Sequence, residues 1–299
     1  MSPLAPIALF AYSRPEHTRR TVEALQANAM AQDSDLFVFS DAAKDPSVRS
    51  GVEAVRRYIG SITGFRTLTI VERERNMGLA ASIIDGVTSL TDSHGSVIVV
   101  EDDLVTSPYF LQYMNEGLQM YRDDEQVISI HGYVYPVRTP LPESFFIRGA
   151  DCWGWATWKR GWDLFEHDGR MLLQKLKEQR LDHAFDWDGT YGNIRMLERQ
   201  IAGKVNSWAI RWHASAFLQG RLTLYPGTSL VRNIGGDAMA THTKSLTEFQ
   251  TGLAGRPLLL ERQPLQEYPA ARQAFVDFFA SIRQPIHRRI LRWITSLFP

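Results

Sequence analysis

The sequence predicts an α/β protein in which helices flank a mostly parallel sheet, followed by an appended α+β half. Short apolar runs alternate with amphipathic helical segments over roughly the first 130 residues, which is the pattern of strands joined by crossover helices. Tryptophan is absent from residues 1–152, whereas seven of the eight tryptophans lie in residues 153–212. This change of composition marks the second half.

Five apolar runs have the length of buried strands. They are Ile7–Tyr12, Leu36–Ser40, Thr67–Val71, Val97–Val100 and Val127–Ile130. Helices are expected between them, at Glu16–Ala31, Val48–Ile62, Leu79–Leu90 and Ser107–Tyr121. The last of these is predicted to begin at Ser107 and Pro108, because serine caps helices and proline suits the first helical position.

The second half is predicted to be less regular. Its expected elements are helices at Met171–Leu181 and Tyr191–Ile201, a strand at Ser207–Trp212, and a hairpin from Leu222–Tyr225 to Ser229–Val231. Trp158 and Trp162 recur at near-helical spacing, which is typical of core packing.

Composition and charge exclude several classes of protein. Lys plus Arg and Asp plus Glu each number 33 in 299 residues, so the chain lacks the basic excess of a nucleic-acid binder. A single cysteine, Cys152, fits a reducing compartment. Neither a signal peptide nor a membrane-spanning apolar run is apparent. We therefore expect a cytoplasmic protein of one large or two small domains.

Three acids, Glu101, Asp102 and Asp103, directly follow the fourth predicted strand. Open α/β folds bind ligands at the carboxyl edge of the sheet. Clustered carboxylates there repel one another unless a cation or hydrogen-bond donors offset the repulsion. Hard oxygen ligands suit Mg²⁺ or Mn²⁺. A solvated acidic loop is the alternative interpretation.

Polar residues also follow the first three strands, at Arg14, Asp41, Asn76 and Gly78. Arg14 enters a helix, where it could clamp a phosphate or stack on a base. Asp41 could accept from the N3–H of uracil or thymine, and Gly78 permits close approach of the backbone to a ligand. Each of these residues, taken alone, is also typical of an ordinary helix start, turn or loop without any role in binding. Together, all four positions should converge on one rim of the sheet.

The order of these motifs resembles the GT-A class of glycosyltransferases, which has a Rossmann-like fold. The matching segments are Phe10–Pro15, Phe39–Asp41, Asn76–Ala80 and Glu101–Leu104, within roughly residues 5–245. They are similar to those of bacterial family-2-like sugar transferases and of N-acetylglucosaminyltransferase I.

The resemblance implies a nucleotide-sugar donor, with UDP or dTDP favoured by Asp41, and a divalent cofactor, Mn²⁺ or Mg²⁺. Asp103 would ligate the metal, Asp102 would face the ribose or the metal shell, and Glu101 would face the donor sugar. The remaining donor-binding residues would be Ala11, Tyr12, Arg14, Asp41, Asn76 and Gly78. Residues 1–132 would bind the nucleotide sugar, 133–245 would hold the acceptor, and 246–299 would form a helical tail.

The tryptophan-rich segment Asp151–Trp158 is the clearest indication of a binding site in the second half. Indole rings stack on pyranose faces, so a tryptophan-rich wall suits a sugar acceptor. We expect Trp153 and Trp155 to contact the acceptor and Gly154 to let the backbone approach it, although packing in the core is the alternative.

Asp188 is the predicted catalytic base, and Asp186 is its rival. Inverting transfer needs one carboxylate that takes the proton of the attacking hydroxyl, and a dry, tryptophan-lined pocket would raise its pKa. Asp188 resembles an aspartate of N-acetylglucosaminyltransferase I. Helix capping is the alternative role for either residue.

Two further features lie toward the C-terminus. His242 follows a glycine-rich segment and is a candidate second metal ligand or phosphate donor, or else a plain surface histidine. Residues 281–299 combine four arginines with apolar residues and no acids. They could bind an anionic membrane surface, or they could form a helix that docks on the protein or on a partner.

The sequence therefore predicts a metal-dependent, inverting glycosyltransferase, a hexosyl- or N-acetylhexosaminyl-transferase, acting on a glycan or lipid-linked acceptor in bacterial surface polysaccharide synthesis. Two alternatives are a nucleotidyltransferase acting on sugar phosphates and a non-catalytic carbohydrate-binding protein.

Overall fold

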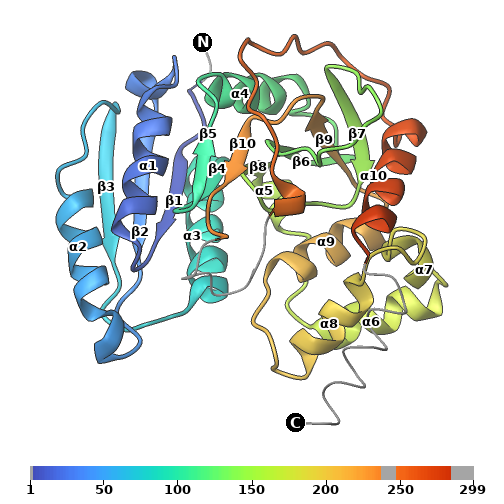
Figure 1. Cartoon of the computed structure of the whole chain (residues 1–299), viewed down its shortest axis with the longest axis horizontal. Helices are drawn as coiled ribbons and strands as arrows, with labels where there is room; N and C mark the ends of the chain where they lie inside the picture. Colours follow the sequence, from blue (N-terminus) through green and yellow to red (C-terminus); the bar gives the residue numbers. More distant parts are fainter. Residues whose placement is uncertain (1–2, 237–246, 284–299) are drawn as a thin grey trace.

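The computed structural model describes residues 3–236 and 247–283. Its core is an eight-stranded sheet in the order β3-β2-β1-β4-β8-β6-β9-β7 (Figure 1). The strands are β1 (Ile7–Ala11), β2 (Asp35–Ser40), β3 (Thr67–Glu72), β4 (Ser96–Glu101), β6 (Val127–His131), β7 (Ser144–Arg148), β8 (Trp155–Trp158) and β9 (Leu222–Pro226). A separate two-stranded sheet pairs β5 (Leu104–Thr106) with β10 (Val231–Asn233).

The sheet is mostly parallel, as the sequence predicts. Strands β3, β2, β1 and β4 run parallel, and so do β6 and β9. Strand β8 runs antiparallel to both β4 and β6, and β7 runs antiparallel to β9. One sheet thus contains strands from both sides of the boundary predicted near residue 132.

Helices cover both faces of the sheet because its strands are apolar on both sides. Side chains of β1 alternate between two apolar clusters, one on each face of the sheet. Ile7 and Leu9 pack in the cluster with helices α1, α2 and α4. Ala8 and Phe10 pack in the cluster with helices α3 and α9. The bounds are α1 (Pro15–Gln26), α2 (Arg49–Ile59), α3 (Leu79–His94), α4 (Phe110–Met120), α5 (Lys159–Trp162) and α9 (Ala209–Leu218). Short 3₁₀ turns lie at Ala31–Asp33, Pro46–Val48 and Thr247–Phe249.

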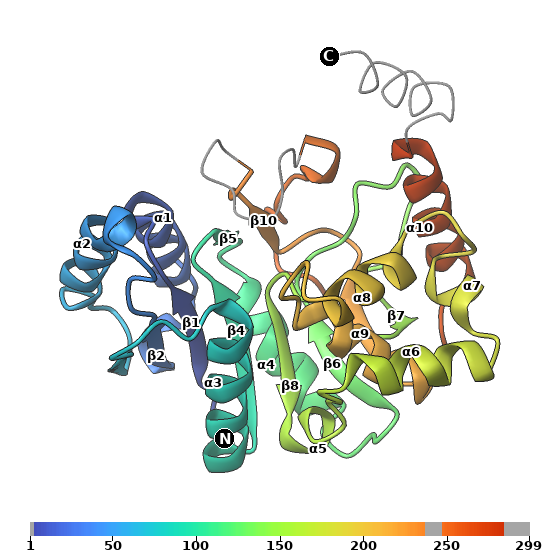
Figure 2. The ribbon, with the colours of Figure 1, turned by 90° about the horizontal axis from the view of Figure 1, so that it is seen from below.

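A second helical group lies at the end of the molecule away from β3 (Figures 1 and 2). It contains α6 (Gly169–Glu178), α7 (Asp182–Phe185) and α8 (Asn193–Ile201), which share an apolar cluster with α9. Helix α10 (Pro269–Ile282) packs beside β7, where the rings of Phe145 and Phe275 meet edge to face.

The predicted strand at Ser207–Trp212 is wrong, because this segment enters helix α9. Ile210, Ala214 and Phe217 face the helical group, while Trp212 and Ala216 face the sheet. A helix that is apolar on two sides lacks a polar face, and over a short window it cannot be told from a buried strand.

The predicted hairpin is also wrong. Strand β9 forms as expected, but the chain after Gly227 leaves the large sheet, and β10 pairs with β5 instead. Strands β5, β7 and β8 were not predicted. The expected core position of Trp158 and Trp162 is confirmed, with 6% and 4% exposure.

None of the helices in the described ranges is long and apolar enough to cross a bilayer.

Candidate active site: an outer cleft and an inner chamber

Arg14 and the acids after β4 meet at the carboxyl edge of the sheet. The Arg14 guanidinium donates to Asp102 at 2.9 Å and to Asp103 at 2.8 Å. The backbone N–H of Tyr12 donates to the other oxygen of Asp102 at 3.2 Å. Asp102 is 5% exposed, so the acids do not form a solvated loop; an arginine from the neighbouring strand end offsets their charge.

The carboxylates raise one another's proton affinity. Burial, followed by repulsion from Asp103 and Asp102, raises the pKa of Glu101 to about 8. Burial also raises the pKa of Asp102, although Arg14 partly opposes the shift. Burial lowers the pKa of Arg14, but the two aspartates outweigh it and raise that pKa overall. The site therefore carries more negative charge than Arg14 alone neutralises.

A cavity of about 630 Å³, here called the outer cleft, opens beside this cluster. Its walls come from both halves of the chain and include Arg14, Leu79, Glu101, Asp103, Cys152, Trp153, Arg195, Arg199, Asn206 and Ser207. Arg195 and Arg199 are one turn apart on α8 and exposed, and neither forms an ion pair with a described residue. The cleft thus combines carboxylates from the first half of the chain with arginines from the second half that have no ion-pair partner among the described residues.

The cleft contains side chains of the kind that bind divalent cations. Among the residues that the structure describes, they do not form a complete metal site. Asp103 and Glu101 offer the carboxylate oxygens that Mg²⁺ and Mn²⁺ prefer. Within residues 3–236 and 247–283, no three acidic, histidine or cysteine side chains gather to hold a metal. Any cation would need further ligands from a bound molecule. His242, the other predicted ligand, lies outside the described residues.

A glycine-bearing loop crosses Asp103. The backbone N–H of Ile234 donates to the Asp103 carbonyl at 2.8 Å. A Cβ atom on Gly235 would lie 2.2 Å from the Asp103 carboxylate, so this position tolerates no side chain without displacing the acid.

Asp41, the predicted reader of a pyrimidine, does not line the outer cleft. Its carboxylate accepts from the backbone of Ala42, Met77 and Gly78 at 2.8–2.9 Å and from the Asn76 amide at 3.0 Å. Four donors fill the capacity of two carboxylate oxygens, and Asp41 is 6% exposed. Asp41 therefore anchors the loop after β3.

Other predicted donor residues have structural contacts. Asn76 and Gly78 are held in the Asp41 loop, Ala11 is buried at the end of β1, and the Tyr12 hydroxyl accepts from the backbone of Lys44. None of these four lines the outer cleft. The strand-end residues thus form two groups, one around Asp41 and one around Arg14.

A second cavity of about 270 Å³, here called the inner chamber, adjoins the outer cleft. Cys152, Trp153, Met196, Ser207 and Ala209 line both. The chamber wall is largely aromatic and includes Tyr133, Tyr135, Trp153, Trp187, Tyr191, His213, Tyr225 and Phe249. Asp151 supplies a carboxylate, and no lysine or arginine is among the described lining residues.

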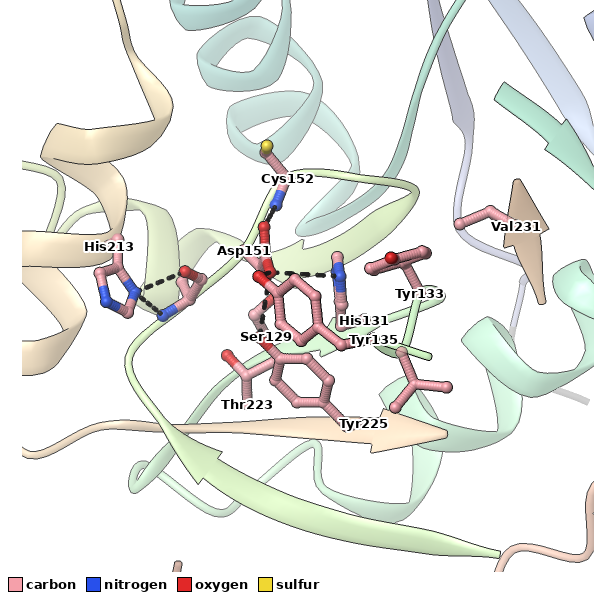
Figure 3. Close-up of polar contacts among 12 residues, drawn as sticks. Ser129, His131, Tyr133, Tyr135, Asp151, Cys152, His213, Thr223, Tyr225 and Val231 are labelled. Carbon is pink, nitrogen blue, oxygen red and sulfur yellow. Dashed lines mark hydrogen bonds and ion pairs between the residues drawn. The ribbon is translucent and has the colours of Figure 1, made fainter. Parts of the chain in front are cut away.

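Asp151 lies at the centre of a polar network in this chamber (Figure 3). One of its oxygens accepts from the Tyr135 hydroxyl at 2.8 Å and from the Tyr225 hydroxyl at 3.3 Å. The other accepts from the backbone of Cys152 at 2.8 Å. Nε2 of His131 lies 3.7 Å from Asp151. The three donors, Tyr135, Cys152 and Tyr225, fix the carboxylate in one orientation.

Burial keeps the neighbours of Asp151 neutral. It lowers the pKa of His131 to about 4, although Asp151 opposes the shift. Burial, aided by the Asp151 charge, raises the pKa values of Tyr135 and Tyr225 far above their usual range. The two phenols therefore remain hydrogen-bond donors, and the network carries the charge of one carboxylate.

The tryptophan-rich segment divides between site and core. Trp153 lines both cavities. Trp155, expected beside the acceptor, is contradicted: it is 0% exposed and packs on Trp162, Trp208 and Trp212. Gly154 has φ +64°, and a Cβ there would lie 2.7 Å from Val231. The positive φ and the close packing against β10 therefore explain why a glycine stands at position 154.

Asp188, the predicted base, and Asp186, its rival, have different surroundings. Asp188 is on the surface, with its side chain 38% exposed, and both of its oxygens bind the Arg272 guanidinium at 2.7 Å. That pairing lowers the pKa of Asp188, opposite to the expected shift. Asp186 accepts from the backbone N–H of Ile194, in the first turn of α8, at 2.6 Å, and burial raises its pKa. Neither residue lines the chamber.

Sequence reasoning missed Asp151, His131, Tyr135 and Tyr225. Asp151 opens the tryptophan-rich segment, and His131 directly follows the predicted strand Val127–Ile130, with Tyr135 four residues later. Their convergence depends on β6, β8 and β9 being neighbours in the sheet, which no local pattern reveals.

The comparisons with known proteins support no closer assignment. No protein-family model matches the sequence, and no curated protein matches it either. Among solved structures, a mannosyltransferase, PcManGT from Pyrobaculum calidifontis, in complex with GDP-Man and Mn²⁺, has a TM-score of 0.33 and 14% identity over 45% of this chain. S. aureus TarS has a TM-score of 0.31 and 13% identity over 48% of this chain. The match spans 36% of the first structure and 24% of the second. Function must therefore be argued from the site.

Proposed function

We propose that this chain is a glycosyltransferase that moves a sugar from a nucleoside-diphosphate sugar to an acceptor. The observation that carries the proposal is the outer cleft, which lies at the carboxyl edge of a parallel sheet and joins an aromatic chamber. Ligands of open α/β folds bind at this edge, and two adjoining cavities of different chemistry suit two substrates.

Positive charge in the outer cleft suits the donor diphosphate. Arg195 and Arg199 present guanidinium groups, which match phosphate oxygens in geometry and charge. Arg14 enters from the opposite half and is already oriented by Asp102 and Asp103. The three arginines would hold the donor across the cleft and stabilise charge on the departing diphosphate.

Asp103, with Glu101 beside it, would hold a divalent cation when one is bound. Such a cation, Mg²⁺ or Mn²⁺, would neutralise charge on the phosphates. Arg14 already pairs with Asp103, so a cation held by Asp103 would compete with the guanidinium for that carboxylate. An Asp102–Arg14 pair would remain to position the guanidinium.

Binding of donors tests this proposal. Calorimetric titration with UDP-, GDP- and dTDP-sugars, each with and without Mn²⁺, should find one nucleotide class that binds and that Mn²⁺ strengthens. Asp103→Asn should remove the Mn²⁺ effect while leaving the melting temperature within a few degrees of wild type. Absence of binding by every nucleotide sugar would refute the proposal.

A further inference from the structure

The inner chamber and the outer cleft differ in charge. The cleft presents three arginines, Arg14, Arg195 and Arg199, beside the carboxylates of Glu101 and Asp103, whereas the described chamber walls carry the Asp151 carboxylate and no arginine or lysine. An anionic group entering the chamber would meet the Asp151 charge without a counter-ion, at a cost of several-fold to tenfold or more in affinity. The chamber therefore selects against acids and phosphates.

The chamber walls are suited to a ring. Trp153 and Tyr191, both partly exposed, supply aromatic faces, and about 270 Å³ of space is enough for a single pyranose but not for a nucleotide. Aromatic faces stack on the C–H face of a sugar, while a carboxylate accepts from its hydroxyls. Asp151 is 23% exposed, so it can be reached from the chamber although its surroundings are buried.

Asp151 is also oriented for chemistry. Tyr135, Tyr225 and the backbone of Cys152 hold its two oxygens, and Figure 3 shows these groups surrounding it. Cys152, the next residue in the chain, lines both cavities. The carboxylate thus lies next in the sequence to a residue that the chamber and the cleft share.

We propose that the inner chamber binds the acceptor as a pyranose ring without negative charge, and that Asp151 is the base that activates it. This inference rests on the proposed function. The acceptor hydroxyl gives its proton to Asp151, and its oxygen forms a bond to the anomeric carbon of the donor. The bond from that carbon to phosphate breaks, and its electron pair leaves with the nucleoside diphosphate.

The binding half of the inference can be measured without turnover. The probes are matched pairs of methyl hexopyranosides and methyl hexopyranosiduronic acids with gluco, galacto and manno configuration, observed by saturation-transfer NMR. At least one neutral glycoside should bind about tenfold more tightly than its acidic partner. Asp151→Asn should remove most of this preference, and Asp188→Asn, which changes a carboxylate outside the chamber, should keep it.

The proposed role of Asp151 as the base is tested in a turnover assay with the nucleotide sugar that the wild-type protein consumes. Asp151→Asn should lower kcat by about 10²-fold or more, which is the usual contribution of a general base, with donor affinity unchanged. Tyr225→Phe removes one donor to Asp151 and should lower kcat a few-fold while moving the acidic limb of the pH profile upward. A merely structural Tyr225 would leave the profile in place.

Two results would overturn the inference: equal binding of neutral and acidic glycosides, or full turnover by Asp151→Asn with the donor consumed as in wild type. Failure of the proposed function would look different. Neutral glycosides would still bind with an Asp151-dependent preference, but the protein would consume no nucleotide sugar.

Discussion

The residues that meet in the outer cleft could be predicted from the sequence more easily than those that meet in the inner chamber. Arg14, Asp102 and Asp103 follow two strands that are neighbours in the sheet, so their meeting follows from strand order alone. Asp151 meets Tyr135 and Tyr225 only because β6 lies between β8 and β9. Charged groups at strand ends are thus predictable, whereas an aromatic chamber depends on the full topology.

The two regions also balance charge by different means. Arg14 offsets two of the three acids in the cleft through ion pairs. Neutral tyrosine hydroxyls and a backbone N–H surround the Asp151 carboxylate in the chamber. The first arrangement depends on one side chain, so removing that side chain should have the largest effect.

Arg14→Ala should lower the free energy of unfolding by about 3 kcal/mol, because it leaves Asp102 and Asp103 unpaired and largely buried. Urea unfolding measures the change. Arg19→Ala, which removes ion pairs of an exposed arginine, should lower the free energy of unfolding far less. Equal losses in the two variants would contradict this description of the cleft.

His131 should make stability fall in acid. Its pKa is about 4 in the folded protein and about 6.5 when unfolded, so the unfolded chain binds more protons between these values. Its contribution is complete above pH 6.5 and is lost as the pH falls toward 4. Wild type should lose about 2 kcal/mol more than His131→Gln between pH 7.5 and 5.0.

The matched control for this titration is His94→Gln, which removes an exposed histidine. It should follow wild type at both pH values. If His131→Gln showed the same pH dependence as wild type, the histidine would not be neutral and buried in solution as it is in the structure.

Arg195→Gln combined with Arg199→Gln should weaken binding of inorganic pyrophosphate about tenfold, equivalent to about 1.4 kcal/mol. Titration calorimetry at low salt gives the affinity. The control is Arg170→Gln combined with Arg180→Gln, two arginines that do not line the cleft. Pyrophosphate binding that is unchanged by the α8 substitutions would place the diphosphate elsewhere.

Asp188→Asn should have the smallest effect. It breaks an exposed pair with Arg272 and should cost less than about 1 kcal/mol of stability, with turnover within twofold of wild type. Turnover assays that showed a hundredfold loss would restore Asp188 as the base and displace Asp151.

The sequence predicted most of the first half because its signals are local. The apolar runs of β1, β2 and β4 are bounded by polar residues, and their predicted ends differ from the structure by one residue. Helix α9 was mistaken for a strand because both of its faces are buried. The sequence did not show that Asp41 turns inward to hold its own loop.

The surroundings of Asp188 differ from those expected for a similar reason. Asp188 lies near Trp187 in the sequence, but Trp187 points into the chamber wall and Asp188 to the surface, each with positive φ, at 50° and 55°. Adjacent residues in a tight turn can point to opposite environments, and the turn itself was not predicted.

The central claim is that the cleft and the chamber bring a nucleotide-sugar donor and a neutral sugar acceptor together. The most direct measurement is the release of nucleoside diphosphate from UDP-, GDP- and dTDP-sugars, followed by chromatography with and without the methyl hexopyranosides. The account predicts that one donor class is consumed and that a neutral glycoside accelerates its release. Nucleotide release from none of the donors, or acceleration by acidic glycosides alone, would contradict it.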